Sequence, residues 1–264
     1  MKHSFIDKYS DLDSFIHRLD PRTRILSTLA FILAVMVTPP TAWEAFALYF
    51  VLLAALIILA QLPPLYVLKR SSVVLPFVLM VAVFVPFMGH GEMTGSYNVW
   101  VWRVSLSHEG LLVLWNMLVK SWLSALALIL LSSTTRFPDL LKGLERLGVP
   151  RVMVMILSFM YRYIFVLADE VMRMRRARDS RGGLGTRVWG REQLRQIRTV
   201  GNMIGTLFIR SYERAERVYG AMVARGFDGQ VRTLSALRFR RADWGFGAAF
   251  CAALLLIGLI TVIS

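Results

Sequence analysis

The stretch LLVLWNMLVKSWLSALALILL, residues 111–131, decides the fold class, because Lys120 is its only charged residue. A helix that crosses a bilayer needs about 20 mostly apolar residues. Four further stretches are apolar enough to cross, the first of them short because it ends near Pro39-Pro40: residues 25–43, 46–62, 73–89 and 244–264. The sequence therefore predicts an all-α, polytopic integral membrane protein with about five transmembrane helices.

Composition agrees with this class. The 264 residues are 56% apolar and carry a formal net charge of +14, whereas soluble domains average about 45–50% apolar residues. High apolarity combined with high positive charge is typical of a membrane protein with a basic cytoplasmic part. A nucleic-acid-binding domain would not contain several long uncharged runs, so no nucleic acid partner is expected.

The positive charge is concentrated in one segment. Residues 134–241 hold 22 Lys/Arg and 9 Asp/Glu, a net of +13, while the remainder holds 9 and 8, a net of +1. We therefore expect three parts: an N-terminal tail with four transmembrane helices (1–133), a basic cytoplasmic domain (134–241) and a final transmembrane helix (242–264).

Loop charges predict the orientation. The tail and loop 62–72 are rich in Lys and Arg, whereas loop 39–45 has none and loop 89–110 has only Arg103. Basic loops stay on the cytoplasmic side, so the N-terminus is expected inside. Residues 1–24 are polar and have no signal-peptide core, which makes the first apolar run a retained anchor. The single cysteine, Cys251, allows no intrachain disulfide.

Two features leave alternatives open. Residues 152–170 are apolar enough for a sixth span, but that crossing would place the following Arg-rich segment outside and would bury Arg162 at a cost of about 2.5–3.5 kcal/mol. We expect a helix at the inner interface and five spans, with six as the alternative. Lys120 either lies on an ion path or faces the helix bundle, and the lack of an acidic partner in the spans favours the bundle.

Candidate functional residues lie at two helix ends in the basic segment. In YGAMVARGFDG, residues 219–229, Gly220, Ala221 and Ala224 form a small-residue face, Arg225 extends from the last turn, and Gly226 can end the helix in a left-handed conformation. This helix is expected from about 192 to 225. A similar ending, Arg181-Gly182, follows a second basic helix, so we interpret the two as a pair of docking tips. A shorter amphipathic helix is expected at 137–150, with Pro138 in its first turn and Gly148 at its C-cap.

Four stretches together resemble the transmembrane T component of energy-coupling factor (ECF) transporters, of the cobalt-type CbiQ group. They cover residues 17 to 229 in the expected order: HRLDPRTRIL, LLKGLERLGVPRVMVMILSFMYRYI, DEVMRMRRARDSRGG and ERAERVYGAMVARGFDG. The resemblance implies a scaffold in the plasma (inner) membrane of a prokaryote, serving cobalt or nickel uptake and hence cobalamin biosynthesis. Its implied partners are a cytoplasmic ABC-type ATPase dimer, a metal-binding membrane S component and, as an optional addition, a small accessory membrane subunit.

In that family two Ala-Arg-Gly motifs end a pair of crossed coupling helices, and each arginine enters an acidic groove on one ATPase subunit. The second motif matches as Ala224-Arg225-Gly226. The first departs from the pattern, since this chain reads Asp179-Ser180-Arg181-Gly182 with Ala177-Arg178 upstream. The resemblance assigns the role to Arg181 because Gly182 follows it, and Arg178 remains the alternative.

The sequence offers no catalytic, cofactor or metal site. It has no G-x-x-x-x-G-K-[ST] motif, so the chain is expected to be a non-catalytic subunit with ATP hydrolysis on partner chains. His3, His17, His90 and His108 are scattered, and a structural metal site usually needs four ligands. Rival interpretations are a stand-alone carrier or channel and an integral-membrane enzyme. The spans hold few polar residues, and none of the carboxylates expected at the inner interface is paired with a nearby His.

Overall fold

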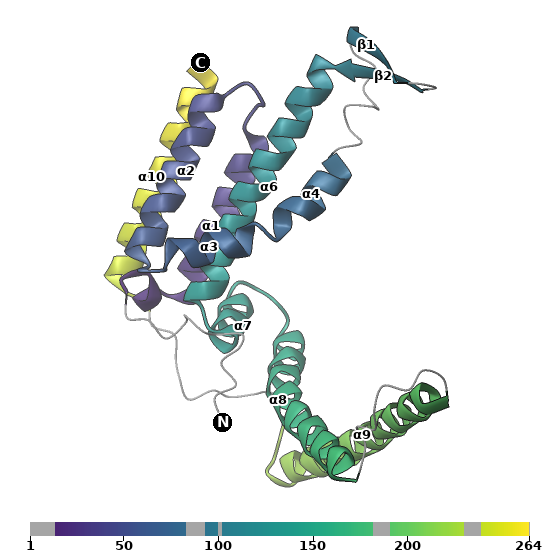
Figure 1. Cartoon of the computed structure of the whole chain (residues 1–264). Coiled ribbons are helices and arrows are strands. Elements are labelled where there is room, and N and C mark those ends of the chain that lie inside the picture. Colours follow the sequence, from purple (N-terminus) through teal and green to yellow (C-terminus); the bar gives the residue numbers. More distant parts are fainter. Residues whose placement is uncertain (1–13, 83–92, 100–101, 182–190, 230–238, 264) are drawn as a thin grey trace. The chain divides into compact units, whose positions relative to one another are not determined.

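The computed structural model describes residues 14–82, 93–99, 102–181, 191–229 and 239–263. Helices dominate these ranges (Figure 1). The elements are η1 (Ile16–Arg18), α1 (Pro21–Val37), α2 (Trp43–Leu59), α3 (Pro64–Ser71), α4 (Val74–Ala82), β1 (Met93–Val99), β2 (Trp102–Ser107), α6 (His108–Thr134), α7 (Phe137–Arg146), α8 (Arg151–Ser180), α9 (Arg191–Ala224) and α10 (Arg241–Ile263).

The predicted class, an all-α polytopic membrane protein, is confirmed. Within the described ranges three helical segments are long and apolar enough to cross a membrane, and α2 is a shorter apolar helix; the three are Leu112–Thr134, Arg151–Ser180 and Arg241–Thr261. The predicted outer loop 89–110 contains an antiparallel hairpin of β1 and β2, in which Val99 pairs with Trp102. This hairpin is a small addition to a helical fold.

Contacts divide the chain into two compact units. The bundle unit comprises residues 2–147 and 236–264, and the two-helix unit comprises residues 148–235, with α8 and α9. Helix α7 belongs to the bundle unit, because it packs against α1. A Cβ atom on Gly143 would lie 2.9 Å from Ile25 Cδ1 and 3.3 Å from Pro21 Cβ, so glycine allows the close approach of α7.

The core of the bundle unit lies among α1, α2, α6 and α10. Phe31 of α1 and Tyr49 of α2 are fully buried and meet edge to face, with ring centroids 5.5 Å apart. Leu123 of α6 and Phe250 of α10 belong to the same buried cluster. Side chains on the opposite faces of these helices are apolar and exposed, for example Leu33 and Leu255. Apolar residues inside and outside are what a helix bundle surrounded by lipid requires.

Helix α1 begins four residues earlier than the apolar run at Ile25. Asp20 forms its N-cap, accepting a hydrogen bond from the Arg22 N–H at 3.0 Å, and Pro21 occupies the first turn. Backbone N–H groups in the first turn have no acceptor within the helix, so proline, which has no N–H, is favoured there. The helix ends at Val37, ahead of Pro39-Pro40 as the sequence predicted.

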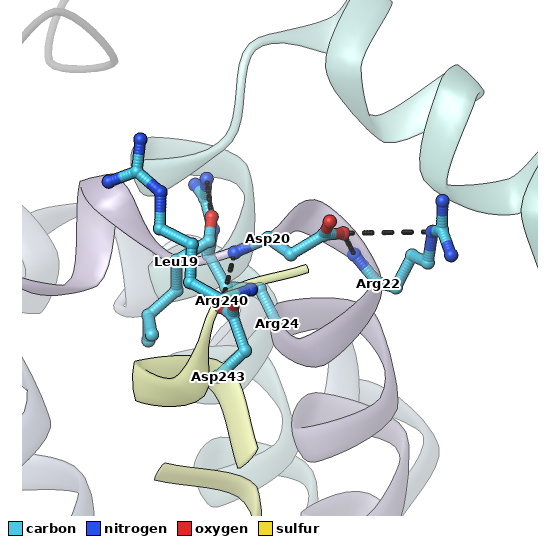
Figure 2. A network of polar contacts seen from close by, with 6 residues as sticks. All are labelled: Leu19, Asp20, Arg22, Arg24, Arg240 and Asp243. Atoms are coloured by element: carbon cyan, nitrogen blue, oxygen red, sulfur yellow. Dashed lines mark hydrogen bonds and ion pairs between the residues drawn. The ribbon is translucent and has the colours of Figure 1, made fainter. Parts of the chain in front are cut away.

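A buried polar cluster, the Asp243 clasp, joins distant parts of the bundle unit (Figure 2). Asp243 accepts hydrogen bonds from the backbone N–H groups of Asp20 and Arg240, each at 2.7 Å. Arg24 lies close by and donates to the Leu19 carbonyl at 2.7 Å, and also to the carbonyl of Thr134. Asp243 and Arg24 are 2% and 8% exposed. The cluster thus ties the start of α1 to the end of α6 and the start of α10.

One predicted loop is helical. Residues 62–72 contain the eight-residue helix α3, which starts at Pro64 and carries Lys69 and Arg70 in its last turn. Ser71 accepts a hydrogen bond from the Trp122 indole N–H at 3.1 Å, which attaches α3 to α6. The span expected at 73–89 is described only as α4, to Ala82; Pro86 and the rest of that stretch lie outside the described residues.

Lys120 faces α1. Its Nζ donates to the backbone carbonyls of Met36 and Thr38, at 2.9 and 2.7 Å. The last carbonyls of a helix have no partner within the helix, so Lys120 caps the C-terminal end of α1. The bundle interpretation of Lys120 is therefore supported by its contacts.

We expect Lys120→Met to destabilise the bundle unit by about 1–3 kcal/mol, because the carbonyls at the end of α1 lose their donor. The measurement is the unfolding temperature of the purified chain in detergent, followed by tryptophan fluorescence. Lys120→Arg keeps a cationic donor and serves as the control. An unchanged unfolding temperature for Lys120→Met would contradict the capping role.

Candidate functional site: two arginine tips on the two-helix unit

Helix α8 is one continuous helix of 30 residues, Arg151–Ser180. Pro150 precedes its first turn, and Gly148, with a φ of +108°, separates it from α7. The apolar run 152–170 and the basic run that follows it therefore belong to the same element, although the sequence suggested two. Many apolar side chains of its first half are exposed, among them Ile156, Met160 and Ile164.

Helices α8 and α9 cross and are joined by an acidic residue. Glu170 of α8 accepts a hydrogen bond from Arg210 of α9 at 2.7 Å and another from Arg173 on its own helix. Next to this contact lies a cavity of about 280 Å³, lined from both helices by Val171, Met174, Arg175, Arg178, Val200, Met203, Ile204 and Leu207. Figure 1 shows the two helices meeting in this region. The two helices thus touch through this exposed ion pair and through the side chains around the cavity.

The end of α9 has a Schellman motif, which fixes the position of Arg225. The Phe227 N–H bonds to the Met222 carbonyl at 3.1 Å, and the Gly226 N–H bonds to the Val223 carbonyl at 2.9 Å. Gly226 has a φ of +77°, the left-handed conformation that this motif requires and that glycine adopts without strain. The sequence predicted this conformation, and it is confirmed.

The surface around Arg225 is open. Ala221, Ala224, Arg225 and Gly226 are all exposed. A Cβ atom on Gly220 would meet nothing within 4 Å, so the small-residue face of the last turn has free space above it. An exposed guanidinium at a helix end, flanked by small residues, can enter a groove and pair there with a carboxylate in a two-bond fork.

The end of α8 carries two arginines in different environments. Arg181 is the C-cap residue and is exposed, and its N–H bonds to the Arg178 carbonyl at 3.1 Å. The half-buried Arg178 pairs instead with Asp179 at 2.9 Å and lines the cavity beside α9. Gly182, the other predicted residue of this tip, lies outside the described residues.

The structure keeps the two tips apart. Leu207 lines the cavity at the crossing, and the 18 residues from it to Arg225 correspond to about 27 Å of helix. The seven residues from Met174 to Arg181 correspond to about 10 Å. The two arginines therefore end separate arms and cannot share one acidic partner residue.

Sequence reasoning missed the contact between Glu170 and Arg210. Glu170 follows Asp169 ahead of a basic run, and its partner Arg210 is 40 residues away, so no local pattern indicates the contact. Helices α8 and α9 carry six acidic residues against twelve arginines, and this excess of arginines was the available signal. Within the described ranges no group of three or more His, Cys, Asp or Glu side chains is placed to hold a metal ion.

Several apolar helices joined to a basic two-helix unit define a multi-pass helical membrane protein. Comparison with known proteins narrows the class. The model of the family described as cobalt transport protein, CbiQ, matches residues 13–234. The chain belongs to this family, and the resemblance seen in the sequence is confirmed.

Named relatives agree with the family. The chain is 29% identical over 269 residues to the energy-coupling factor transporter transmembrane protein EcfT of Clostridium kluyveri, covering 97% of this chain and 95% of that one. It is 29% identical over 265 residues to the EcfT of Brevibacillus brevis, covering 97% and 96%. It is also 36% identical over 105 residues to the cobalt transport protein CbiQ of Rhodobacter capsulatus, covering 40% and 41%. The protein is therefore a transmembrane component of a transporter.

Proposed function

We propose that this chain is the scaffold and coupling subunit of an ATP-driven ECF-type uptake transporter for cobalt or nickel ions. It links two cytoplasmic ATPase subunits to a membrane subunit that binds the metal ion, and it carries the motion of the ATPases to that subunit. The N-terminus and the two arginine tips lie on the cytoplasmic side, and the apolar first half of α8 lies at the inner membrane interface. The family to which the chain belongs, that of the cobalt transport protein CbiQ, supports the choice of metal.

One observation carries the coupling role: two crossed helices each end in an exposed arginine, on arms too far apart to meet. Two separate tips suit two ATPase subunits, each of which receives one arginine. The Schellman motif at Gly226 holds Arg225 in place, and small residues on the same turn leave room for the wall of a groove. A rigid helix then transmits the displacement of its tip along its length.

The environments of Arg178 and Arg181 support Arg181 as the first docking residue. Arg178 already pairs with Asp179 and packs beside the cavity, so using it for docking would break an existing contact. Arg181 is exposed at the end of the helix. In this proposal Arg181 and Gly182 form the first tip, while Ala221, Ala224, Arg225 and Gly226 form the second.

The experiment is to purify the tagged chain from membranes of its native host, identify its companions, and measure uptake of radioactive Co²⁺ in proteoliposomes. We expect an ABC-type ATPase and a metal-binding membrane subunit to co-purify. Uptake should require ATP and every subunit, and Ni²⁺ should compete for it. Co²⁺ uptake by the purified chain alone, without ATP, would instead show a stand-alone carrier.

A further inference from the structure

The bundle unit contains an open apolar groove on the side of α6. Helices α2 and α4 both pack against α6, and between them lies a groove of about 700 Å³. Its lining is almost entirely apolar and comprises Phe46, Phe50, Ser72, Leu75, Pro76, Leu79, Trp115, Leu118, Val119, Trp122 and Leu123. This groove plays no part in the docking tips, which lie in the other unit.

Aromatic side chains form much of the groove surface and are only half covered. Trp115 is 49% exposed and Phe50 is 44% exposed. Phe50 stacks on Trp122 with ring centroids 5.7 Å apart, and the Trp122 N–H is used by Ser71, so this pair presents apolar rings. From Trp115 to Leu123 the floor of the groove extends about 12 Å along α6. A slot of this kind favours a long, flexible hydrocarbon chain.

One end of the groove is polar and positive. Ser72 lines it where α3 ends and α4 begins. Lys69 lies three residues before Ser72, which places both on one side of the helix, and Lys69 and Arg70 are exposed. The first N–H groups of α4 have no partner within that helix and form the positive end of its dipole. The Ser72 hydroxyl donates to the Leu68 carbonyl at 2.8 Å, so the cation and the helix start are what make this end of the apolar slot complementary to an anionic amphiphile.

We propose that this groove binds an anionic phospholipid, with one acyl chain along α6 between α2 and α4, and with the phosphate at the α3–α4 junction beside Lys69 and Ser72. The loop charges predict that this junction lies on the cytoplasmic side, where anionic lipid headgroups attract basic residues. A transmembrane helix of another subunit would also cover the aromatic floor, but it would leave the positive end unmatched. The inference does not depend on the proposed transport function.

The test uses the purified full-length chain in nanodiscs that contain brominated phosphatidylglycerol or brominated phosphatidylcholine, since bromine quenches tryptophan on contact. The chain has seven tryptophans, so the signal of Trp115 is obtained by subtracting the Trp115→Phe variant. We expect phosphatidylglycerol to quench Trp115 at a mole fraction about five-fold lower than phosphatidylcholine does, the preference expected for one basic residue at an anionic membrane surface.

Variants separate the contribution of the lipid headgroup from that of its acyl chain. Lys69→Gln should bring phosphatidylglycerol to the level of phosphatidylcholine, Lys69→Arg should keep the preference, and Lys142→Gln on α7 is the matched charge control. Val119→Phe, which fills the groove floor, should weaken quenching by both lipids. Equal quenching by both lipids in the wild-type chain would overturn the headgroup site. A Trp115 signal that neither lipid quenches would show that protein covers the groove, and would overturn the proposal as a whole.

Discussion

Replacing Arg181 and Arg225 together by alanine is expected to remove the ATPase subunits from the complex while the chain still inserts into the membrane. In the proposed complex each guanidinium is hydrogen-bonded to a carboxylate in a partly desolvated groove. Truncating one partner of such a pair costs about 2–5 kcal/mol, which weakens binding at least about 30-fold for each arginine. The measurement is the amount of ATPase retained in a pull-down of the tagged chain, together with ATP-dependent Co²⁺ uptake.

Matched controls separate docking from general charge. Arg217→Ala removes an exposed arginine of α9 that pairs loosely with Glu213, at 3.8 Å. Arg176→Ala removes an exposed arginine of α8. Both controls should retain the ATPases. Arg178→Ala should lie close to the controls if Arg181 is the first tip. Wild-type ATPase retention by the Arg181→Ala/Arg225→Ala chain would refute the docking role.

Asp243→Ala is expected to be the most destabilising single change in the bundle unit, by about 2–5 kcal/mol. The buried carboxylate accepts from two backbone N–H groups, those of Asp20 and Arg240. Each donor left without an acceptor costs about 1–3 kcal/mol. Arg24, buried nearby, also loses a neighbouring negative charge. The unfolding temperature of the purified chain, followed by tryptophan fluorescence in detergent, measures the effect.

Two further variants locate the cause. Asp243→Asn keeps one acceptor oxygen and should lie between the wild type and Asp243→Ala. Arg18→Ala removes an exposed charge close to the clasp in the sequence and should leave the unfolding temperature unchanged. If Asp243→Ala unfolds at the wild-type temperature, the Asp243 clasp does not stabilise the bundle.

Local signals in the sequence were sufficient for much of the fold and for one tip. The apolar run 111–131 predicted α6 because hydropathy over about 20 residues depends on composition alone. The end of α9 was predictable because an Arg-Gly ending needs only neighbouring residues to form its cap. The assignment of docking roles to Arg181 and Arg225 came from the family resemblance and stays a proposal.

Other features depend on contacts that the sequence does not record. Asp20 and Asp243 are 223 positions apart, and the residues next to either one in the sequence do not indicate the other. Lys120 binds backbone carbonyls, which have no residue signature. Helix α3 looked like a loop because two prolines and two charges surround a short apolar stretch. The hydrogen bond from Trp122 to Ser71 attaches α3 to α6 and stabilises a helix that its own sequence does not favour.

Helix α1 ends ahead of Pro39-Pro40 with Lys120 capping its last carbonyls, and its length affects the surrounding bilayer. Both α1 and α2 have 17 residues, about 26 Å each, whereas the hydrocarbon core is about 30 Å thick. The 27 residues of α6 reach about 40 Å. Apolar side chains of α1 such as Leu29 and Leu33 are exposed, so lipid must adapt to the short helices. We therefore expect the bilayer to thin beside α1 and α2, and the protein to respond to the acyl-chain length of its lipids.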